Sequence, residues 1–245
     1  MALAIPDKKP LQIIHARLSD LRPGLMAYVI TRVARKWETV LPGGTIPING
    51  DLLLVDDRGG SIEVVIPHDC MRRFSSDKVV KGKVYKILHF EVLDRKKKYK
   101  SIPAEFTIYF NSSTKLIELT EGINMYPMYF FRFADMIEIR ERSKKDPVFT
   151  DVIGMFVGYG EPIAISVDSG TRMSDKLDVN LRLLRSFIIV FCLLYSSLYV
   201  ETKFISSSST TKVYVNPDIL EAEEIRQRFK NDLAPVQLLA PEHTS

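Results

Sequence analysis

Two short stretches of the chain place an aromatic ring beside clustered cations. The first is "VITRVARKWETV" (29–40), which holds the only tryptophan, and the second is "LDRKKKYKS" (93–101). Flat rings stack on nucleic-acid bases, and lysine and arginine pair with phosphates. The two stretches therefore predict a site for a single-stranded nucleic acid. Its candidate residues are Arg32, Arg35, Lys36, Trp37, Arg95, Lys96, Lys97, Lys98 and Tyr99.

Each of these residues also has a plainer interpretation, which the sequence leaves open. Trp37 could be a packed strand residue, and Tyr99 could be an ordinary exposed tyrosine. A run of charges such as 95–98 is usually a solvated hairpin tip.

Other kinds of chemistry find little support in the sequence. The four histidines show no metal-ligand spacing, and there is no glycine-rich phosphate loop and no GxSxG motif. The two cysteines, Cys70 and Cys192, are far apart, which argues against a disulfide framework and for a reducing compartment. We therefore expect no enzyme activity, no catalytic residue, no metal, no cofactor and no small-molecule substrate.

Charge divides unevenly along the 245 residues. Residues 1–147 hold 25 Lys and Arg against 18 Asp and Glu, a net charge of +7, whereas residues 148–245 have a net charge of −3. The first half is therefore the expected contact for a polyanion. The apolar run 187–200 is only 14 residues long, shorter than a membrane-spanning helix, and fits buried strands, so we expect no membrane partner.

The elements that must position the candidate residues are mostly strands. Strand patterns cover "LMAYVITRVARKWETV", both arms of "DLLLVDDRGGSIEVVIP" around a turn at 57–60, "VYKILHFEV", "AEFTIYFN" and "TKLIELT", with a short helix expected between the third and fourth strands. This order is that of an OB-fold, a five-stranded Greek-key barrel. In that fold the loops 38–50 and 94–100 would flank the binding groove, and both candidate stretches reach those loops.

At this point the sequence resembles a known family. The ordered series "RVARKW", "LVDDRG", "KGKVY" and "TTKVYVNPD" is similar to the large, 70 kDa DNA-binding subunit of replication protein A, in particular its plant members. The resemblance implies single-stranded DNA binding in DNA replication, repair or recombination, in the nucleus, with other subunits of that protein as further partners. RNA stays open as a ligand, because OB grooves accept either.

The resemblance also implies a division into domains. We expect an OB-fold at 1–145, an incomplete second OB-like domain at 148–233 that ends in a helix, and a disordered tail at 234–245. The second domain is expected to lack its central strands, since "TRMSDKLDVNLRLLRS" is short and polar. The helix is expected in "NPDILEAEEIRQRFKNDL", capped by Asn216.

The sequence departs from the family at two groove positions. Glu63 stands where the family has an arginine, and Pro67 falls near a family aromatic. Both favour an alternative function, a protein-interaction module of the same fold that has lost its affinity for nucleic acid.

Overall fold

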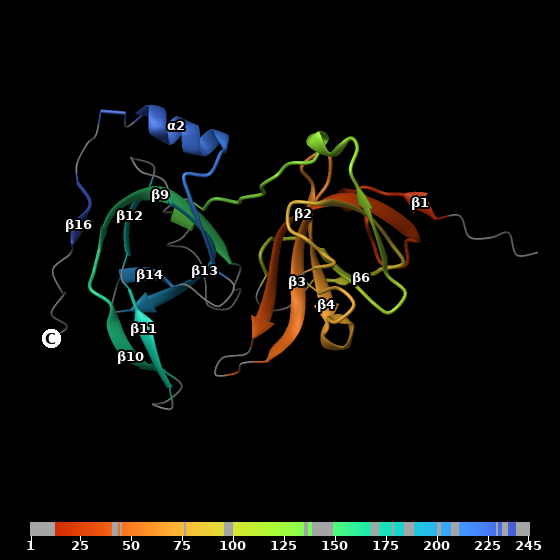
Figure 1. Ribbon diagram of the computed structural model, residues 1–245, viewed down its shortest axis with the longest axis horizontal. Helices are drawn as coiled ribbons and strands as arrows, with labels where there is room; N and C mark the ends of the chain where they lie inside the picture. The colour runs from red at the N-terminus through yellow and green to blue at the C-terminus, as the bar shows by residue number, and fades with distance from the viewer. Residues whose placement is uncertain are drawn as a thin grey trace, which may run out of the picture. The chain divides into compact units, whose positions relative to one another are not determined.

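The structure is a computed structural model. It describes residues 13–40, 44, 46–75, 77–95, 100–134, 137–138, 149–167, 172–177, 179–183, 189–199, 202–206, 211–228, 230–231 and 235–238. The chain divides into two compact units (Figure 1). The first comprises residues 1–37, 49–96 and 104–130, and the second comprises residues 38–48, 97–103 and 131–245.

A curled sheet makes up most of the first unit, and residues 38–40 and 47–48 at the ends of two of its strands are assigned to the second unit. Its strands are β1 (Ile14–His15), β2 (Ala27–Val40), β3 (Pro47–Val55), β4 (Ser61–Pro67), β5 (Val84–Leu88), β6 (Glu91–Asp94), β7 (Phe106–Tyr109) and β8 (Lys115–Leu119). Three short 3-10 helices accompany them: η1 (Leu18–Asp20), η2 (His68–Cys70) and η3 (Ile123–Met125). Among the described residues, neighbouring strands follow the order β6-β7-β4-β3-β2-β5-β8, with β1 beside β2.

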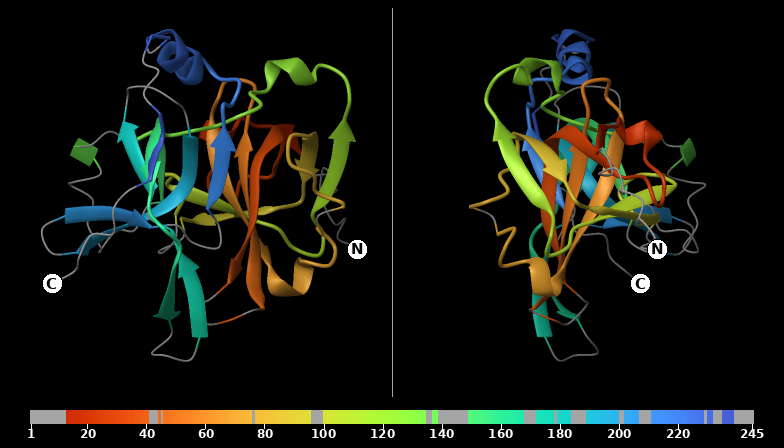
Figure 2. Two further views of the ribbon diagram at one scale, coloured as in Figure 1. Left: turned by 60° about the vertical axis from the view of Figure 1, so that its left-hand side comes forward. Right: turned by 90° about the vertical axis from the view of Figure 1, so that its right-hand side faces the viewer.

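Short links connect each end of this strand order to the other end. The end strand β6 follows β5, which lies beside β8, and the end strand β8 follows β7, which lies beside β6. Only His89 and Phe90 separate β5 from β6, and residues 110–114 separate β7 from β8. His89 makes the bend with a φ of 57°, and the hydroxyl of Thr114 donates to its carbonyl oxygen at 2.9 Å. The joined pairs β5–β6 and β7–β8 act as the fourth and fifth strands of a barrel, whose curl is visible in Figure 2.

Strand pairing within the sheet is mixed. β3 and β4 pair antiparallel, with Leu53 opposite Glu63, and β4 pairs in parallel with β7, with Val64 opposite Ile108. A parallel contact between the third and the last strand is what closes the OB-fold. The predicted mainly β fold class is therefore confirmed. The expected short helix between the third and fourth strands is η2, followed by turns.

Alternate residues of these strands fill one core. The core includes Val29 and Val33 of β2, Leu52 and Leu54 of β3, and Val64 of β4. This period of two follows from the pleat of a strand, which sends successive side chains to opposite faces. The opposite face of the same strands therefore carries Leu53, Glu63 and their neighbours.

The second unit contains two separate sheets among its described residues. Its strands are β9 (Thr150–Tyr159), β10 (Ile163–Val167), β11 (Arg172–Lys176), β12 (Val179–Leu183), β13 (Ile189–Tyr199), β14 (Thr202–Ser206), β15 (Lys212–Val215) and β16 (Gln237–Leu238). β10 and β11 form a hairpin by themselves, and β12-β9-β13-β14 form the larger sheet, in which β15 pairs with β13 and β16 with β9.

Two sequence expectations for this unit differ from the structure. The stretch expected to lack strands contains β11 and β12, and Val179, Leu181 and Leu183 show the alternation of a strand. Within the segment expected to be a disordered tail, Gln237 and Leu238 pair with β9. The division into domains at 1–145, 148–233 and 234–245 stays a prediction.

The expected helix is present as α2 (Leu220–Arg228), with Ala222 and Ile225 buried. It begins later than the cap prediction places it, because Asn216 has a φ of +47° and lies in the left-handed region instead of capping the first turn. Within the described ranges, no helix has the length and apolar character required to cross a bilayer, and residues 189–199 of the apolar run form β13.

Candidate nucleic-acid interface

Arg32 lies in the middle of β2 and is bonded to the main chain. It pairs with Val84 across the β2–β5 ladder. Its Nε donates to the Tyr126 carbonyl at 3.0 Å and its Nη2 to the Ile123 carbonyl at 2.6 Å, while its Nη1 donates to the Gly82 carbonyl. Only 4% of the residue is exposed, and this burial lowers the pKa of the guanidinium.

Arg35 and Lys36 follow the same pattern. The Nη2 of Arg35 donates to the Phe130 carbonyl at 2.5 Å, and Arg35 is buried. The ammonium of Lys36 donates to the Val79 carbonyl at 3.0 Å and to the Phe74 carbonyl at 3.4 Å. These three cations of one strand therefore hold parts of the chain that lie far from them in sequence.

Trp37 is 5% exposed in this structure. It lies beyond Val33, the last β2 residue in the core of the first unit. The packing interpretation of this tryptophan requires such burial, whereas stacking on a base requires a free ring face. Contact between Trp37 and a nucleic acid stays a prediction.

The second candidate stretch is described only at its ends. Arg95 is exposed, and its backbone amide donates to the Glu105 carbonyl at 2.9 Å, which fixes the base of the loop. Lys96, Lys97, Lys98 and Tyr99 lie outside the described residues. Among the described residues predicted to contact a phosphate, Arg95 is thus the one that is exposed.

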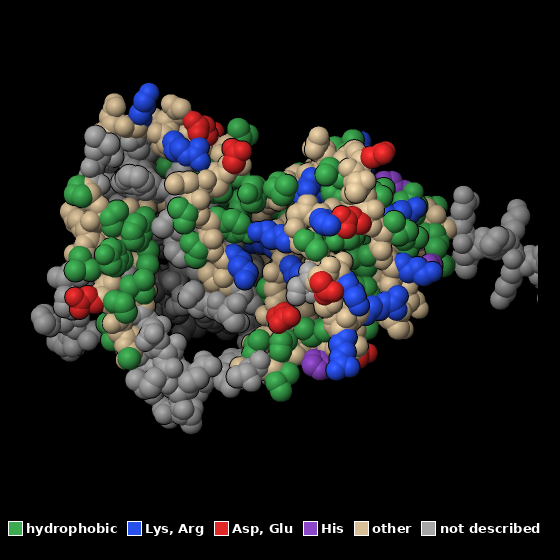
Figure 3. All heavy atoms as spheres, in the orientation of Figure 1, with side chains coloured by type: hydrophobic (Ala, Val, Ile, Leu, Met, Phe, Trp, Pro, Cys, Tyr) green, Lys and Arg blue, Asp and Glu red, His purple; other side chains and the backbone are tan. Residues whose placement is uncertain are grey.

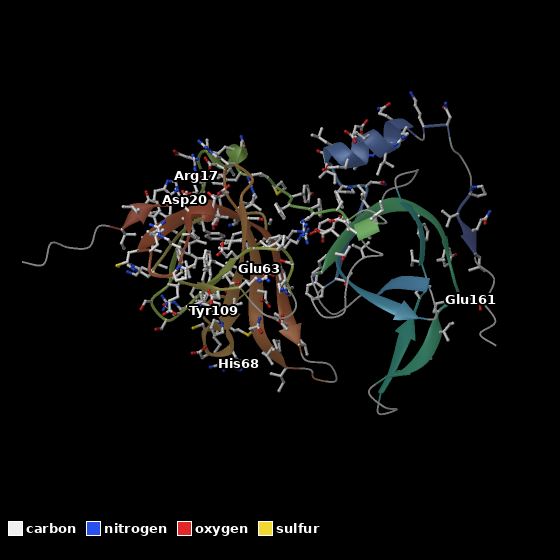
Figure 4. All side chains as sticks on the ribbon, turned by 180° about the vertical axis from the view of Figure 1, so that it is seen from behind. Arg17, Asp20, Glu63, His68, Tyr109 and Glu161 are labelled. Atoms are coloured by element: carbon white, nitrogen blue, oxygen red, sulfur yellow. The ribbon has the colours of Figure 1, made fainter. Side chains whose placement is uncertain are left out.

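Acidic residues occupy the sheet face opposite the core. Asp51 of β3 and Glu63 of β4 are 1% and 2% exposed, and the register places Glu63 beside Thr107 of β7. Figure 4 labels Glu63 within the sheet and His68 of η2 at the end of the unit away from Asp20 of η1. The departure from the family suggested that the charge of Glu63 would lie on the surface. Glu63 is instead buried.

One cluster of rings and cations was not anticipated from the sequence. The rings of His15 and Tyr28 stack with centroids 5.1 Å apart and planes 15° apart, and the Lys86 ammonium lies 4.0 Å from the Tyr28 centroid. Strand register brings both His15 and Lys86 to Tyr28, since β1 pairs in parallel with β2 and Ile30 pairs with Lys86. Alternation within one strand cannot reveal that arrangement.

The described residues contain no group of three or more His, Cys, Asp and Glu side chains that could hold a metal ion. Figure 3 shows lysine and arginine side chains spread over the visible face of the first unit and interspersed with fewer acidic ones. Lysine and arginine side chains are therefore spread over this face, and the cations of β2 donate to backbone carbonyl oxygens of the same chain.

Comparison with known proteins bears on both units. The chain is 25% identical over 206 residues to a 70 kDa DNA-binding subunit of replication protein A from Arabidopsis thaliana, and the match covers 73% of this chain and 24% of that protein. The chain thus spans about a quarter of the length of this relative. The resemblance stated from the sequence motifs is confirmed.

The fold has a solved counterpart. A chain from the structure of a replication protein A heterotrimer bound to ssDNA superposes with a TM-score of 0.60 at 22% identity, covering 91% of this chain and 56% of the other. This likeness concerns the fold and supports the OB architecture of the chain. At the level of sequence families, the model described as a domain of unknown function, DUF223, matches residues 19–141. That match covers half of the chain, and the protein belongs to the DUF223 family.

Proposed function

We propose that this protein binds single-stranded DNA through its first unit, in DNA replication, repair or recombination. The observation that carries the proposal is the joint similarity, in sequence and in fold, to replication protein A chains, one of them solved in a complex bound to ssDNA. The strand order of the first unit supports it, because OB-folds bind oligonucleotides across their second and third strands.

In the proposed mechanism, cations of the first unit attract the strand and rings hold its bases. Arg95 and the adjoining residues Lys96–Lys98 follow the phosphates, and Tyr99 and Trp37 stack with bases. Lys36 belongs to the same set, whereas Arg32 and Arg35, which the sequence predicted as further phosphate contacts, are buried and bonded to carbonyl oxygens. For Arg32 and Arg35, contact with a phosphate would require the guanidinium to give up the carbonyl oxygens that it now holds.

The remaining parts of the proposal follow from the same similarity. The protein acts in the nucleus, without catalysing a reaction, and other replication protein A subunits are its further partners. The alternative, a protein-interaction module without affinity for nucleic acid, loses part of its support because Glu63 is buried.

The test is a titration of fluorescently labelled oligo-dT with the full chain, read by anisotropy at several salt concentrations. We expect saturable binding that weakens as salt rises, since each neutralised phosphate of a single strand contributes about −0.7 to the slope of log K against log salt. An oligo-rU of the same length tests for RNA. Absence of binding at low salt would support the interaction module and overturn the proposal.

A further inference from the structure

The chain leaves the first unit through a segment without a β-strand. We call residues 122–130, which follow β8 and include η3, the exit segment; Figure 1 draws it in green. Its local backbone bond joins the Tyr126 amide to the Ile123 carbonyl at 3.2 Å. Met125 and Met128 are 61% and 51% exposed, whereas Ile123, Tyr126 and Phe130 are half-buried.

Guanidinium groups attach this segment to β2. Three carbonyl oxygens of the exit segment, those of Ile123, Tyr126 and Phe130, accept hydrogen bonds from Arg32 or Arg35. These acceptors are spread along most of the segment, so they fix its path and not one point of it. The third bond of Arg32, to the Gly82 carbonyl, ties the same guanidinium to the turn before β5.

The turn at Gly82 is itself held against β2. Its amide donates to the Val33 carbonyl at 2.8 Å, and the Val33 amide donates to the Lys83 carbonyl at 3.0 Å. A Cβ added at Gly82 would lie 3.7 Å from the Met128 sulfur, so the exit segment passes directly over this turn. Arg32 therefore lies between two pieces of chain that contact each other.

The burial of these arginines favours an internal role. Arg32 and Arg35 are 4% and 3% exposed, and a buried guanidinium requires hydrogen-bond acceptors, which all three nitrogens of Arg32 have in backbone carbonyl oxygens. Hydrogen bonds from a charged group are stronger than neutral ones, and the carbonyls left behind would lose their partners. A phosphate arriving at β2 would have to replace these bonds, whereas the exposed Arg95 faces no such cost.

We infer that Arg32 and Arg35 are positioning residues that clamp the exit segment onto β2, and that they are not phosphate ligands. They set the path by which the chain departs from the first unit as far as Phe130. The inference rests on the proposed function only in its statement about phosphates; the clamp can be measured without DNA.

The experiment is limited chymotrypsin digestion of the full chain, with cleavage after Tyr129, Phe130 and Phe131 followed by mass spectrometry. We expect Arg35→Ala and Arg32→Ala to be cut about tenfold faster there than the parent chain, because each removes at least one charge-assisted bond. Arg32→Lys, which keeps one donor group, should give an intermediate rate. Unchanged cleavage in both alanine variants would overturn the inference.

A parallel salt titration with oligo-dT separates the clamp from phosphate binding. We expect the salt slope of Arg35→Ala to equal that of the parent, and Arg95→Ala to reduce it by about 0.7 with cleavage unchanged. A slope reduced by that amount in Arg35→Ala would overturn the inference. If the parent chain itself does not bind, the proposed function fails, and the cleavage rates still decide on the clamp.

A variant in the exit segment guards against misfolding of the arginine variants. Gly122 has a φ of +65°, which a β-branched residue does not readily adopt, and its Cβ would meet open space. Gly122→Val should therefore loosen the exit segment while leaving β2 intact, with faster cleavage and an unchanged salt slope. A steeper slope would mean that freed guanidiniums take phosphates, and would overturn the inference.

Discussion

Trp37 is the residue on which packing and base stacking make opposite demands. At 5% exposure the indole has the environment of a packed side chain. We expect Trp37→Ala to lower the free energy of unfolding by about 3–5 kcal/mol, the usual cost of removing a buried aromatic ring. Urea denaturation followed by circular dichroism measures this loss.

The matched variant is Trp37→Phe, which keeps a ring that can both pack and stack. It should retain most of the stability and bind oligo-dT within about threefold of the parent, a difference of less than 1 kcal/mol. If Trp37→Ala proved as stable as the parent yet bound oligo-dT weakly, stacking and not packing would be the role of this residue.

Cys70 gives a second prediction at the residue scale, on pH and reactivity. Burial raises the pKa of its thiol, and the neighbouring Asp69 raises it further through its charge and a hydrogen bond. A raised pKa means that less thiolate, the reactive form, is present at pH 8 than in a free cysteine. We expect Ellman's reagent to modify Cys70 at least about tenfold more slowly in the folded chain than in urea.

Cys192→Ser isolates the Cys70 signal in that measurement. The reaction should accelerate as pH rises, since the thiolate fraction grows toward the raised pKa. A folded rate equal to the rate in urea would show that the thiol is neither buried nor shifted.

The β3–β4 hairpin is the element whose stability depends most clearly on one side chain. The Asp56 carboxylate accepts from the amides of Arg58 at 3.0 Å, Gly60 at 2.7 Å and Leu18 at 3.2 Å. It thereby fastens η1 to the turn as well as closing the turn. A Cβ at Gly60 would lie 2.8 Å from this carboxylate, which is why glycine fits here.

We expect Asp56→Ala to cost about 3 kcal/mol of unfolding free energy, because it leaves three amides of a buried site without their charged acceptor. The control lies one residue away: Asp57 is exposed in the same turn, so Asp57→Ala should change stability by less than about 0.5 kcal/mol. Urea midpoints of the two variants give the comparison, and equal effects would contradict it.

Elements of the first unit were predictable because their signals are local. Alternation of apolar residues marked the strands, and the Asp-Arg-Gly-Gly turn marked the hairpin, where Gly59 has a φ of +79°. In the second unit, β12 shows the same alternation but was hidden by the polar composition around it. Asn216 has the residue type of a cap, yet its left-handed backbone delays the helix to Leu220.

The candidate site was less predictable, because tertiary contacts decide it. A cation beside an aromatic ring gives the same sequence pattern whether the partner of the cation is a phosphate or a carbonyl oxygen. The partner of Arg35 is Phe130, 95 residues away, and no local pattern links the two. The stack of His15, Tyr28 and Lys86 likewise depends on three strands meeting.

At the scale of the whole molecule, charge separates the two halves of the chain. Residues 1–147 have a net charge of +7 and residues 148–245 a net charge of −3. Since backbone phosphates dominate affinity for nucleic acid, the first half should supply nearly all of the electrostatic attraction. One OB-fold covers about 4–16 nucleotides.

We therefore expect the affinity for oligo-dT, corrected for the number of overlapping sites, to rise with length up to about 16 nucleotides and then to level off. Anisotropy titrations with oligomers of about 8, 16, 24 and 32 nucleotides at one salt concentration measure this. A second barrel that also bound the strand would add its own contacts at high effective concentration. A further gain of more than about tenfold between 16 and 32 nucleotides would thus show that the second unit binds despite its negative charge, and that charge balance is a poor guide to which unit carries the activity.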